Sequence, residues 1–549
     1  MNLSPQMKLK RLIAPEKSDI YIVVIYGLCS GLLSLVIPIS VQTLVNTISF
    51  GSMLQPVFVL TFIVLLVLGG SALMRGLQIF IMEIIQQRLF ARMALQLAQK
   101  IPGFQIKSFD SSQGPELINR FFDVLTVQKS TALIVLDGVF VLLQTVVGLV
   151  LLGFYHPFLL VFDLILLALI LGVILFLGKG AIYTSILESK AKYAVASWLQ
   201  ELARIPILFK HPEARNFILN RADHLTVDYV QNRKAHFKIL MSQIVGTLSL
   251  QVIASSVLLG LGGLLVIKRQ LTLGQLVASE LIVTSVLTGV GKFGKYLECY
   301  YDLVAAADKL DYLLNLPEEE QGPLPAAGEF QNYPAYSICF NEIEYAYLET
   351  TPCLTGVTFR AQKGQKVVIY GARASGKSTL CDLLYQLKQP LRGTIQLNGI
   401  DSRDCHSREY REKIAFLRDA ELMDGTLFDN LKIHRENLTL REAYAACEKV
   451  GVLKEIHDFP LGLMTPVSAG RVPLSQGQAK LLALARAILS EPKLFVLDGF
   501  LDDLDDESKN LALRYFLQEC PATVVMTTHS MALAQTAKSY WVLEKGRLI

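Results

Sequence analysis

The sequence contains one glycine-rich segment whose residue types are suited to binding phosphate groups. It reads GARASGKS and lies between the apolar run KVVIY and the helical pattern TLCDLLYQL. In a strand–loop–helix of this kind, the backbone N–H groups of the loop and the helix N-terminus face the phosphates. Lys377 would reach the β- and γ-phosphates, and the Ser378 hydroxyl would bind Mg²⁺. The segment predicts a site for ATP and Mg²⁺ formed by Gly371, Ala372, Arg373, Ala374, Ser375, Gly376, Lys377, Ser378 and Thr379.

A carboxylate follows a second buried strand further along the chain. The apolar run LFVLDGF at 494–500 contains Asp498, and a carboxylate at the end of a strand beside such a loop orders the Mg²⁺ shell. Between the two lies PLSQGQAKLLALARAIL, in which a polar turn opens a long helix. The N-terminus of that helix is a second candidate anion site.

The elements that hold these residues belong to the second half of the chain, and the first half is much more apolar. The 549 residues are 52% hydrophobic and 18% charged, with a mean hydropathy of +0.41, whereas soluble domains carry about 25% charged residues. These values predict an integral membrane protein in a lipid bilayer. A net charge of +4 gives no reason to expect a nucleic acid partner, and the eight scattered cysteines show no disulfide framework.

A linker rich in Pro, Gly and Glu at 316–335 separates two expected domains. The first, 1–315, is predicted to be a membrane all-α bundle with long cytoplasmic extensions, and the second, 336–549, an α/β P-loop nucleotide-binding domain. A membrane span needs about 20 apolar residues. Six stretches meet or approach this length, at about 20–46, 55–84, 131–154, 157–178, 238–267 and 274–302.

The distribution of charge gives an orientation for the predicted bundle. Lys and Arg gather in the N-terminal tail and in the long connections at 85–130 and 179–237, which places these segments and the second domain in the cytoplasm. Charges at membrane depth are functional candidates, although several of them can also lie at helix ends. Of Asp137, Asp163, Glu280 and Lys292, we expect Glu280 to face a cavity.

Taken in order, these residues resemble the ATP-binding cassette (ABC) transporter family over essentially the whole chain. The segment LSQGQ, 474–478, resembles the family signature LSGGQ, in which Ser475, Gly477 and Gln478 would contact nucleotide held by the opposing subunit. Tyr347 resembles the aromatic residue that stacks on adenine. The resemblance implies catalytic roles for Asp498 and for His529, the switch histidine that contacts the γ-phosphate.

Six spans followed by one cassette resemble a half-size exporter of the bacterial type. The resemblance implies a dimer of half-transporters in the cytoplasmic membrane, exporting an unidentified substrate by alternating access. It also implies short coupling helices, for which 115–123 and 213–221 are the expected positions. Asp505 takes the last position of the family's SALD loop.

Two departures from the family pattern bear on catalysis. In the family, the carboxylate at the position of Asp498 is the Walker B aspartate, and the glutamate that follows it polarises the attacking water. This chain has Gly499 at the position of that glutamate. Losing a general base lowers the rate by about 10²–10⁴, so we expect slow hydrolysis. The family also has a Gln that contacts Mg²⁺ where this chain reads Arg418–Asp419 in a shorter segment. Asp419 is the expected replacement as a Mg²⁺ ligand.

The sequence leaves the assembly open. The chain can be the degenerate subunit of a heterodimer, in which its intact LSQGQ completes the partner's site, or it can form a homodimer that uses Asp502, Asp503 or His529 as the base. A third reading is a nucleotide-binding gate or scaffold of a secretion complex. A secretion adaptor stays open as a partner. With about 19 residues before the first span, we expect no N-terminal peptidase domain.

Overall fold

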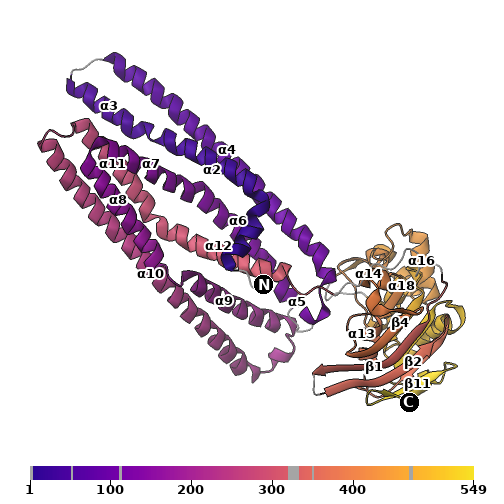
Figure 1. Ribbon diagram of the computed structural model, residues 1–549. Coiled ribbons are helices and arrows are strands. Elements are labelled where there is room, and N and C mark those ends of the chain that lie inside the picture. Colours follow the sequence, from indigo (N-terminus) through magenta and orange to yellow (C-terminus); the bar gives the residue numbers. More distant parts are fainter. Residues whose placement is uncertain (1–3, 51–53, 110–113, 320–332, 349–350, 469–473) are drawn as a thin grey trace. The chain divides into compact units, whose positions relative to one another are not determined.

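The computed structural model describes residues 4–50, 54–109, 114–319, 333–348, 351–468 and 474–549. The chain divides into two compact units, Met1–Glu318 and Glu319–Ile549. The first consists of helices and the second combines sheets with helices (Figure 1). The predicted fold class, a helical membrane bundle followed by an α/β domain, is confirmed.

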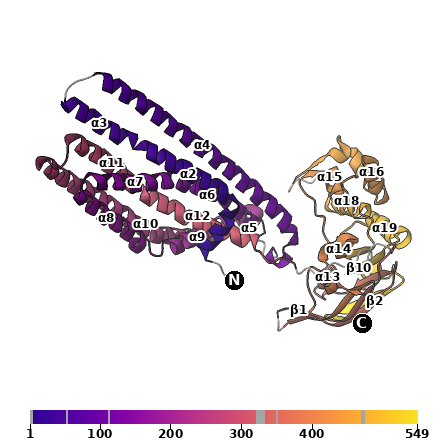
Figure 2. The same cartoon turned by 45° about the horizontal axis from the view of Figure 1, so that its top comes forward.

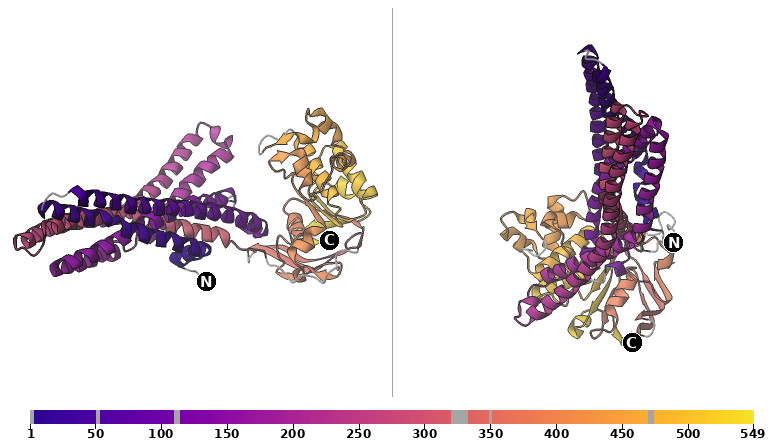
Figure 3. Two further views of the ribbon diagram at one scale, coloured as in Figure 1. Left: turned by 90° about the horizontal axis from the view of Figure 1, so that it is seen from above. Right: turned by 90° about the vertical axis from the view of Figure 1, so that its left-hand side faces the viewer.

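Twelve α-helices are found in the described part of the first unit. They are α1 (Pro5–Ile13), α2 (Lys17–Ser34), α3 (Val36–Phe50), α4 (Leu54–Lys100), α5 (Gly114–Asn119), α6 (Asp123–Leu133), α7 (Val139–Tyr155), α8 (Pro157–Gly172), α9 (Ala181–Arg204), α10 (Ala214–Ile267), α11 (Leu273–Gly291) and α12 (Phe293–Leu314). The long helices of this unit run lengthwise alongside one another (Figure 3). Both α4 and α10 are apolar at one end and rich in charge at the other, so each combines a segment suited to lipid with an extension suited to water.

Several helices are long and apolar enough to cross a membrane. Among the described residues these are the stretches Pro5–Ile48, Gln55–Gly103, Leu117–Tyr155, Pro157–Leu177 and Ala214–Ile267, and the shorter apolar helix Leu273–Val286 follows them. Each of the stretches predicted at 20–46 and 274–302 is interrupted at one residue. Leu35 separates α2 from α3, and Lys292 separates α11 from α12.

Close helix packing accompanies the second of these breaks. A Cβ atom at Gly289 would lie 2.4 Å from Val141 Cγ1, and one at Gly294 would lie 2.6 Å from Ile244 Cγ1. Glycine lets helix backbones approach closely in a membrane bundle. These two glycines therefore let the chain on both sides of Lys292 pack tightly against α7 and α10.

The second unit contains short helices and two main sheets. Its strands are β1 (Ile338–Leu348), β2 (Thr351–Ala361), β3 (Lys366–Tyr370), β4 (Arg392–Leu397), β5 (Ile400–Asp401), β6 (Ile414–Leu417), β7 (Gly425–Thr426), β8 (Pro466–Val467), β9 (Leu494–Asp498), β10 (Thr523–Thr528), β11 (Tyr540–Glu544) and β12 (Arg547–Leu548). Its helices are α13 (Lys377–Leu384), α14 (Ser407–Glu412), α15 (Leu427–Lys432), α16 (Leu440–Lys449), α17 (Leu453–Asp458), α18 (Gln476–Leu489), α19 (Asp506–Arg514) and α20 (Met531–Ala534). Figure 2 shows α15, α16 and α18 gathered at one end of the unit, and β1 and β2 at the other.

The order of the strands positions the predicted site. The larger sheet has the order β12-β11-β3-β10-β9-β6. From β11 to β6 its strands pair in parallel, and β12 pairs antiparallel with β11. All of the side chains of β9 and β10 are buried, because both faces of a parallel sheet are covered. The carboxyl ends of β3, β10 and β9 therefore lie side by side at one edge, where ligands of α/β proteins usually bind.

Candidate functional site

The glycine-rich loop joins β3 to α13, as the sequence predicts. Gly376 has a φ of +103°, and a Cβ atom there would lie 2.7 Å from Leu354 Cδ2, so the turn into α13 requires glycine. The ammonium of Lys377 lies across the loop and donates to the carbonyl oxygens of Gly371 and Ala372, each at 2.7 Å. Burial lowers the pKa of Lys377, and the charges of Asp502 and Asp498 oppose this effect.

The exposed part of the loop and the first turn of α13 complete the predicted phosphate site. Ala372, Arg373 and Ala374 are exposed, whereas Ser375 and Thr379 are buried. The backbone of this segment provides N–H groups at a helix N-terminus, which favours an anion. The loop therefore fits the triphosphate of ATP.

Asp498, the last residue of β9, is held by three neighbours. Its side chain is 5% exposed. Oδ1 accepts hydrogen bonds from Ser378 Oγ at 3.1 Å and from Thr527 Oγ1 at 2.9 Å. Oδ2 accepts one from Arg418 Nε at 2.6 Å. The structure thus brings Ser378 and Asp498 together as predicted, and adds a guanidinium to the pair.

Arg418 follows β6 and connects the strand ends to α13. Besides Asp498, it binds the carboxylate of Asp382 and lies 3.4 Å from the Ser378 carbonyl oxygen. Burial acts to lower the pKa of Arg418, but the hydrogen bond to Asp382 and the charge of Asp498 outweigh it and raise the pKa. The neighbouring Asp419 is exposed. In the described part of the chain it makes no hydrogen bond or ion pair, and the residue of this segment that contacts Asp498 is Arg418, so the role of Asp419 as a Mg²⁺ ligand stays a prediction.

Position 499, the expected place of the general base, lies next to a buried carboxylate. Gly499 has a φ of +61°, and a Cβ atom there would have Asp502 Oδ2 as its nearest neighbour at 3.8 Å. Asp502 is 5% exposed and lies 2.7 Å from His529 Nδ1. It also accepts a hydrogen bond from the His529 backbone N–H at 3.1 Å. His529, directly after β10, therefore joins the site through Asp502.

Tyr347, the predicted adenine-stacking residue, is attached to the beginning of α13. Its side chain is 60% exposed, and its hydroxyl shares a hydrogen bond with Thr379 Oγ1 at 3.0 Å. Lys388 donates to the same hydroxyl at 2.9 Å and lies over the ring at 4.5 Å from its centre. The ring is thus exposed and fixed near the phosphate loop, as an adenine platform requires.

The signature segment forms the beginning of α18. Ser475 caps the helix: its hydroxyl accepts from Gln478 N–H at 3.2 Å, and Gln478 Oε1 accepts from Ser475 N–H at 2.8 Å. A Cβ atom at Gly477 would lie 3.7 Å from Asp505 Oδ1. Neither Ser475 nor Gln478 makes a hydrogen bond to the P-loop within the residues that the structure describes. The structure does not bring the signature of this chain to its own P-loop.

One contributor to this region was not singled out from the sequence. Lys480 lies on the buried face of α18 with its side chain 1% exposed. It donates to Asp503 Oδ2 at 2.9 Å and to the Phe500 carbonyl oxygen at 3.3 Å. A lysine among the apolar residues of α18 is an unusual feature of the sequence, but it does not name the partner of the lysine. Lys480 ties the signature helix to the loop after Gly499.

Charged side chains line cavities among the described helices of the first unit. One, of about 700 Å³, lies among α2, α4, α7, α11 and α12 and is lined by Arg75, Asp137 and Lys292 together with hydroxyl and amide side chains. Arg75 binds Asp137 and donates to the Leu136 carbonyl oxygen at 2.7 Å. Glu280 lines neither this cavity nor the second one. The charged group that the sequence analysis overlooked here is Arg75, although it lies inside the predicted span 55–84.

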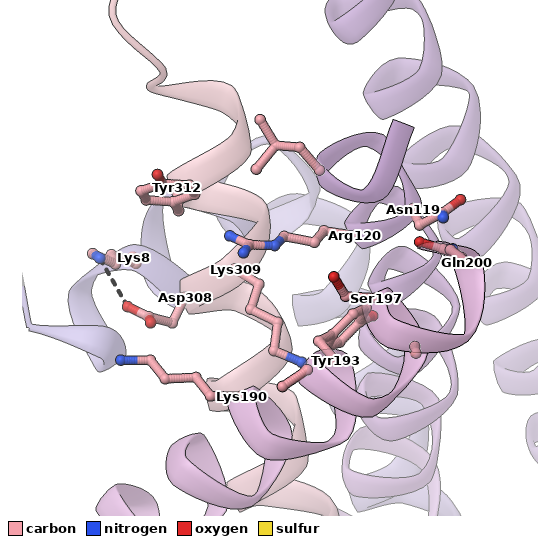
Figure 4. Close-up of a pocket in the computed structure, with 13 residues that line it drawn as sticks. Lys8, Asn119, Arg120, Lys190, Tyr193, Ser197, Gln200, Asp308, Lys309 and Tyr312 are labelled. Carbon is pink, nitrogen blue, oxygen red and sulfur yellow. Dashed lines mark hydrogen bonds and ion pairs between the residues drawn. The ribbon is translucent and has the colours of Figure 1, made fainter. Parts of the chain in front are cut away.

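The second cavity, of about 670 Å³, lies among α1, α9 and α12 (Figure 4). Lys8 binds Asp308 at its rim at 2.8 Å. Lys309 extends toward Tyr193, with its ammonium 4.1 Å from the ring centre, and forms an ion pair with the buried Asp123 at 3.4 Å. Most cations around this cavity thus have a partner within the bundle, and their contacts connect α12 to α1, α6 and α9.

The fold and the site together define a multi-pass membrane protein with a P-loop nucleotide-binding domain. The chain belongs to the ABC transporter family: the family's profile "ABC transporter" matches residues 354–500, and "ABC transporter transmembrane region" matches residues 20–204. Together the two matches cover more than half of the chain. They include the P-loop and Asp498 on one side and the helices from α2 to α9 on the other.

Curated relatives match at low identity. The chain is 26% identical over 321 residues to the alpha-hemolysin translocation ATP-binding protein of Escherichia coli O6:H1, which is 57% of this chain and 45% of that protein. It is 25% identical over 488 residues to the lactococcin-A transport/processing ATP-binding protein of Lactococcus lactis subsp. lactis, 86% of this chain and 65% of that protein. The matched regions thus span less than two thirds of either relative.

A solved structure supports the fold along nearly the whole chain. A bacterial Atm1-family ABC exporter with ATP bound superposes with a TM-score of 0.86 at 16% identity, covering 98% of this chain and 94% of that chain. At this identity the likeness establishes the fold.

Proposed function

We propose that the chain is one half of an ATP-driven exporter, and that its own Walker site holds nucleotide and hydrolyses it slowly. The observation that carries this proposal is the meeting of Lys377, Asp498 and His529 at one sheet edge beside Gly499. The P-loop retains its binding groups, while the position of the general base has no side chain. The names and fold of the relatives support export as the direction of transport.

The residues of the site have separate roles in nucleotide binding. The loop N–H groups and Lys377 bind the triphosphate, and the exposed ring of Tyr347 stacks on the adenine. Ser475 and Gly477 of the opposing subunit close the site, since neither is hydrogen-bonded to the P-loop of its own chain among the residues that the structure describes. Bound ATP supplies the free-energy difference between the closed and open dimers, and it can do so only if the closed form binds it more tightly.

Mg²⁺ fits this chain's own Walker site poorly. Its expected ligands, Ser378 and Asp498, lie together, but Oδ2 of Asp498 is bound by Arg418 at 2.6 Å. A dication there would meet a guanidinium on the same carboxylate. No group of three or more His, Cys, Asp or Glu side chains that could hold a metal ion is found among the described residues.

The membrane unit is proposed to carry the substrate across the cytoplasmic membrane, with the N-terminus and cassette in the cytoplasm. We propose that polar groups of the substrate contact the cavity lined by Arg75, Asp137 and Lys292, and not Glu280. The proposed partner is a second half-transporter, either another copy of this chain or a chain with a complete Walker B site. If the chain is instead a gate or scaffold of a secretion complex, the same site binds nucleotide but the chain transports no substrate.

Hydrogen–deuterium exchange on the full chain in lipid nanodiscs tests this proposal. We expect ATP to protect the P-loop at 371–379 and the signature at 475–485, and Lys377→Ala to remove both effects. Protection of both segments in the chain alone supports a homodimer. Protection of the P-loop alone indicates that a different half-transporter must supply the opposing surface. No protection of either segment would contradict the proposal.

A further inference from the structure

Arg418 forms a fixed cationic bridge at the place where an ABC cassette is expected to order a divalent cation. Its Nε atom lies 2.6 Å from Asp498 Oδ2, and its Nη2 atom binds Asp382 and approaches the Ser378 carbonyl oxygen. The two carboxylates come from β9 and from α13. The guanidinium thus lies between the strand end and the first turn of the phosphate-binding helix.

The bridge joins a partly exposed guanidinium to two buried carboxylates, since the Arg418 side chain is 36% exposed. The side chains of Asp498 and Asp382 are 5% and 9% exposed, and the guanidinium lies 5.1 Å from the centre of the Phe416 ring. Removing one partner of a buried ion pair is strongly destabilising because a buried charge is left without compensation. Releasing Arg418 would leave the buried carboxylate of Asp498 without a cation, and it would remove one of the two cations bound to Asp382.

The charges near the P-loop are already compensated without a metal ion. Asp382 is bound both by Arg418 and by Lys388, the latter at 2.8 Å. Arginine stays protonated at all relevant pH values, and its planar fork suits two acceptors at once. A dication that bound Asp498 would have to displace this guanidinium or lie against it, and like charges at that distance repel strongly.

We propose that Arg418 takes the place of the divalent cation, so that this chain's Walker site binds ATP without Mg²⁺. This inference rests on the proposed function, in which the P-loop binds ATP. Arg418 and Lys377 then supply the positive charge around the β- and γ-phosphates. The arrangement also favours a site that holds nucleotide, since Asp498 remains tied to Arg418.

Calorimetric titration of the full chain in lipid nanodiscs with ATP tests this inference. We expect the dissociation constants in excess Mg²⁺ and in excess EDTA to agree within about threefold, which is less than 1 kcal/mol. In Arg418→Gln, which restores the amide of the family, EDTA should weaken binding by about tenfold or more. Arg403→Gln is the matched control, because Arg403 pairs with Asp401 at the surface.

Each result decides a separate question. If EDTA weakens ATP binding to the unsubstituted chain by about tenfold or more, the inference is wrong and the proposed function stands. If the chain binds no ATP in either buffer, the proposed function fails and the inference fails with it. The comparison in the unsubstituted chain decides the matter even if Arg418→Gln does not fold.

Discussion

The carboxylate of Asp502 binds the imidazole of His529, with Oδ2 2.7 Å from Nδ1. Because a carboxylate only accepts, this contact assigns the proton to Nδ1 and leaves Nε2 as an acceptor in the neutral ring. The same Oδ2 atom lies 3.8 Å from the place where a side chain at position 499 would begin. A carboxylate therefore remains beside the position from which the usual glutamate is missing.

The contacts of Asp502 predict a loss of stability on substitution. In Asp502→Asn the charge is lost, and the hydrogen bonds to the His529 ring and backbone weaken. Since a hydrogen bond to a charged group contributes about 1.5–3 kcal/mol, we expect the melting temperature of the cassette to fall by about 3–12 °C. Differential scanning of the full chain measures this. Asp506→Asn, whose side chain is 100% exposed, is the control and should leave the transition unchanged.

Restoring the missing glutamate alone should have little effect on turnover. The φ of +61° at Gly499 disfavours any side chain by about 1–2 kcal/mol, and a glutamate would also meet the negative charge of Asp502. We expect Gly499→Glu to raise ATP turnover by less than tenfold, against about 10²–10⁴ for a functioning base. Phosphate release from the full chain in lipid, with Lys377→Ala as the blank, gives the rate.

Two further variants identify which features of the site limit the rate of ATP hydrolysis. Combining Gly499→Glu with Asp502→Ser removes the opposing charge, and adding Arg418→Gln frees Asp498. The rate should rise with each addition. A hundredfold gain from Gly499→Glu alone would show that the missing base is the sole defect.

The sequence was sufficient for the fold class and the main nucleotide-binding residues. The P-loop at Gly371–Ser378 carries its own structural signal, because a strand, a glycine turn and a helix must follow one another directly. Asp498 could be found for a related reason: it ends a fully apolar strand. Both signals are local in the chain.

The ion pairs of the site could not be predicted, because they join residues far apart in the sequence. Arg418 reaches Asp498 only because β6 and β9 are neighbours in the sheet, and sequence reasoning chose the adjacent Asp419 by its chemical type. Lys480 of α18 and Asp503, which follows β9, also come from different elements and meet only in the folded chain. In the membrane unit, Arg75 lies within the predicted span 55–84 and was not singled out. Glu280 was chosen because it lies within the predicted span 274–302.

The ion pair in the first cavity predicts coupled effects. Arg75→Met leaves Asp137 without its cation among apolar helices, and Asp137→Leu leaves Arg75 without its anion. We expect each single variant to lower the melting temperature of the protein in lipid by about 2–8 °C, equivalent to about 1–2 kcal/mol. The double variant should lose less than the sum of the two. Strictly additive losses would mean that the pair does not contribute as a unit.

The most direct test of the account is to measure bound nucleotide and ATP turnover together on the chain purified alone in lipid, with its oligomeric state read from the same sample. The account predicts one ATP bound per chain, loss of that binding in Lys377→Ala, and turnover in the unsubstituted chain close to that of this blank. Rapid turnover that depends on Lys377 would contradict it, since a Walker site with Gly499 in place of the base would then be a fully working ATPase.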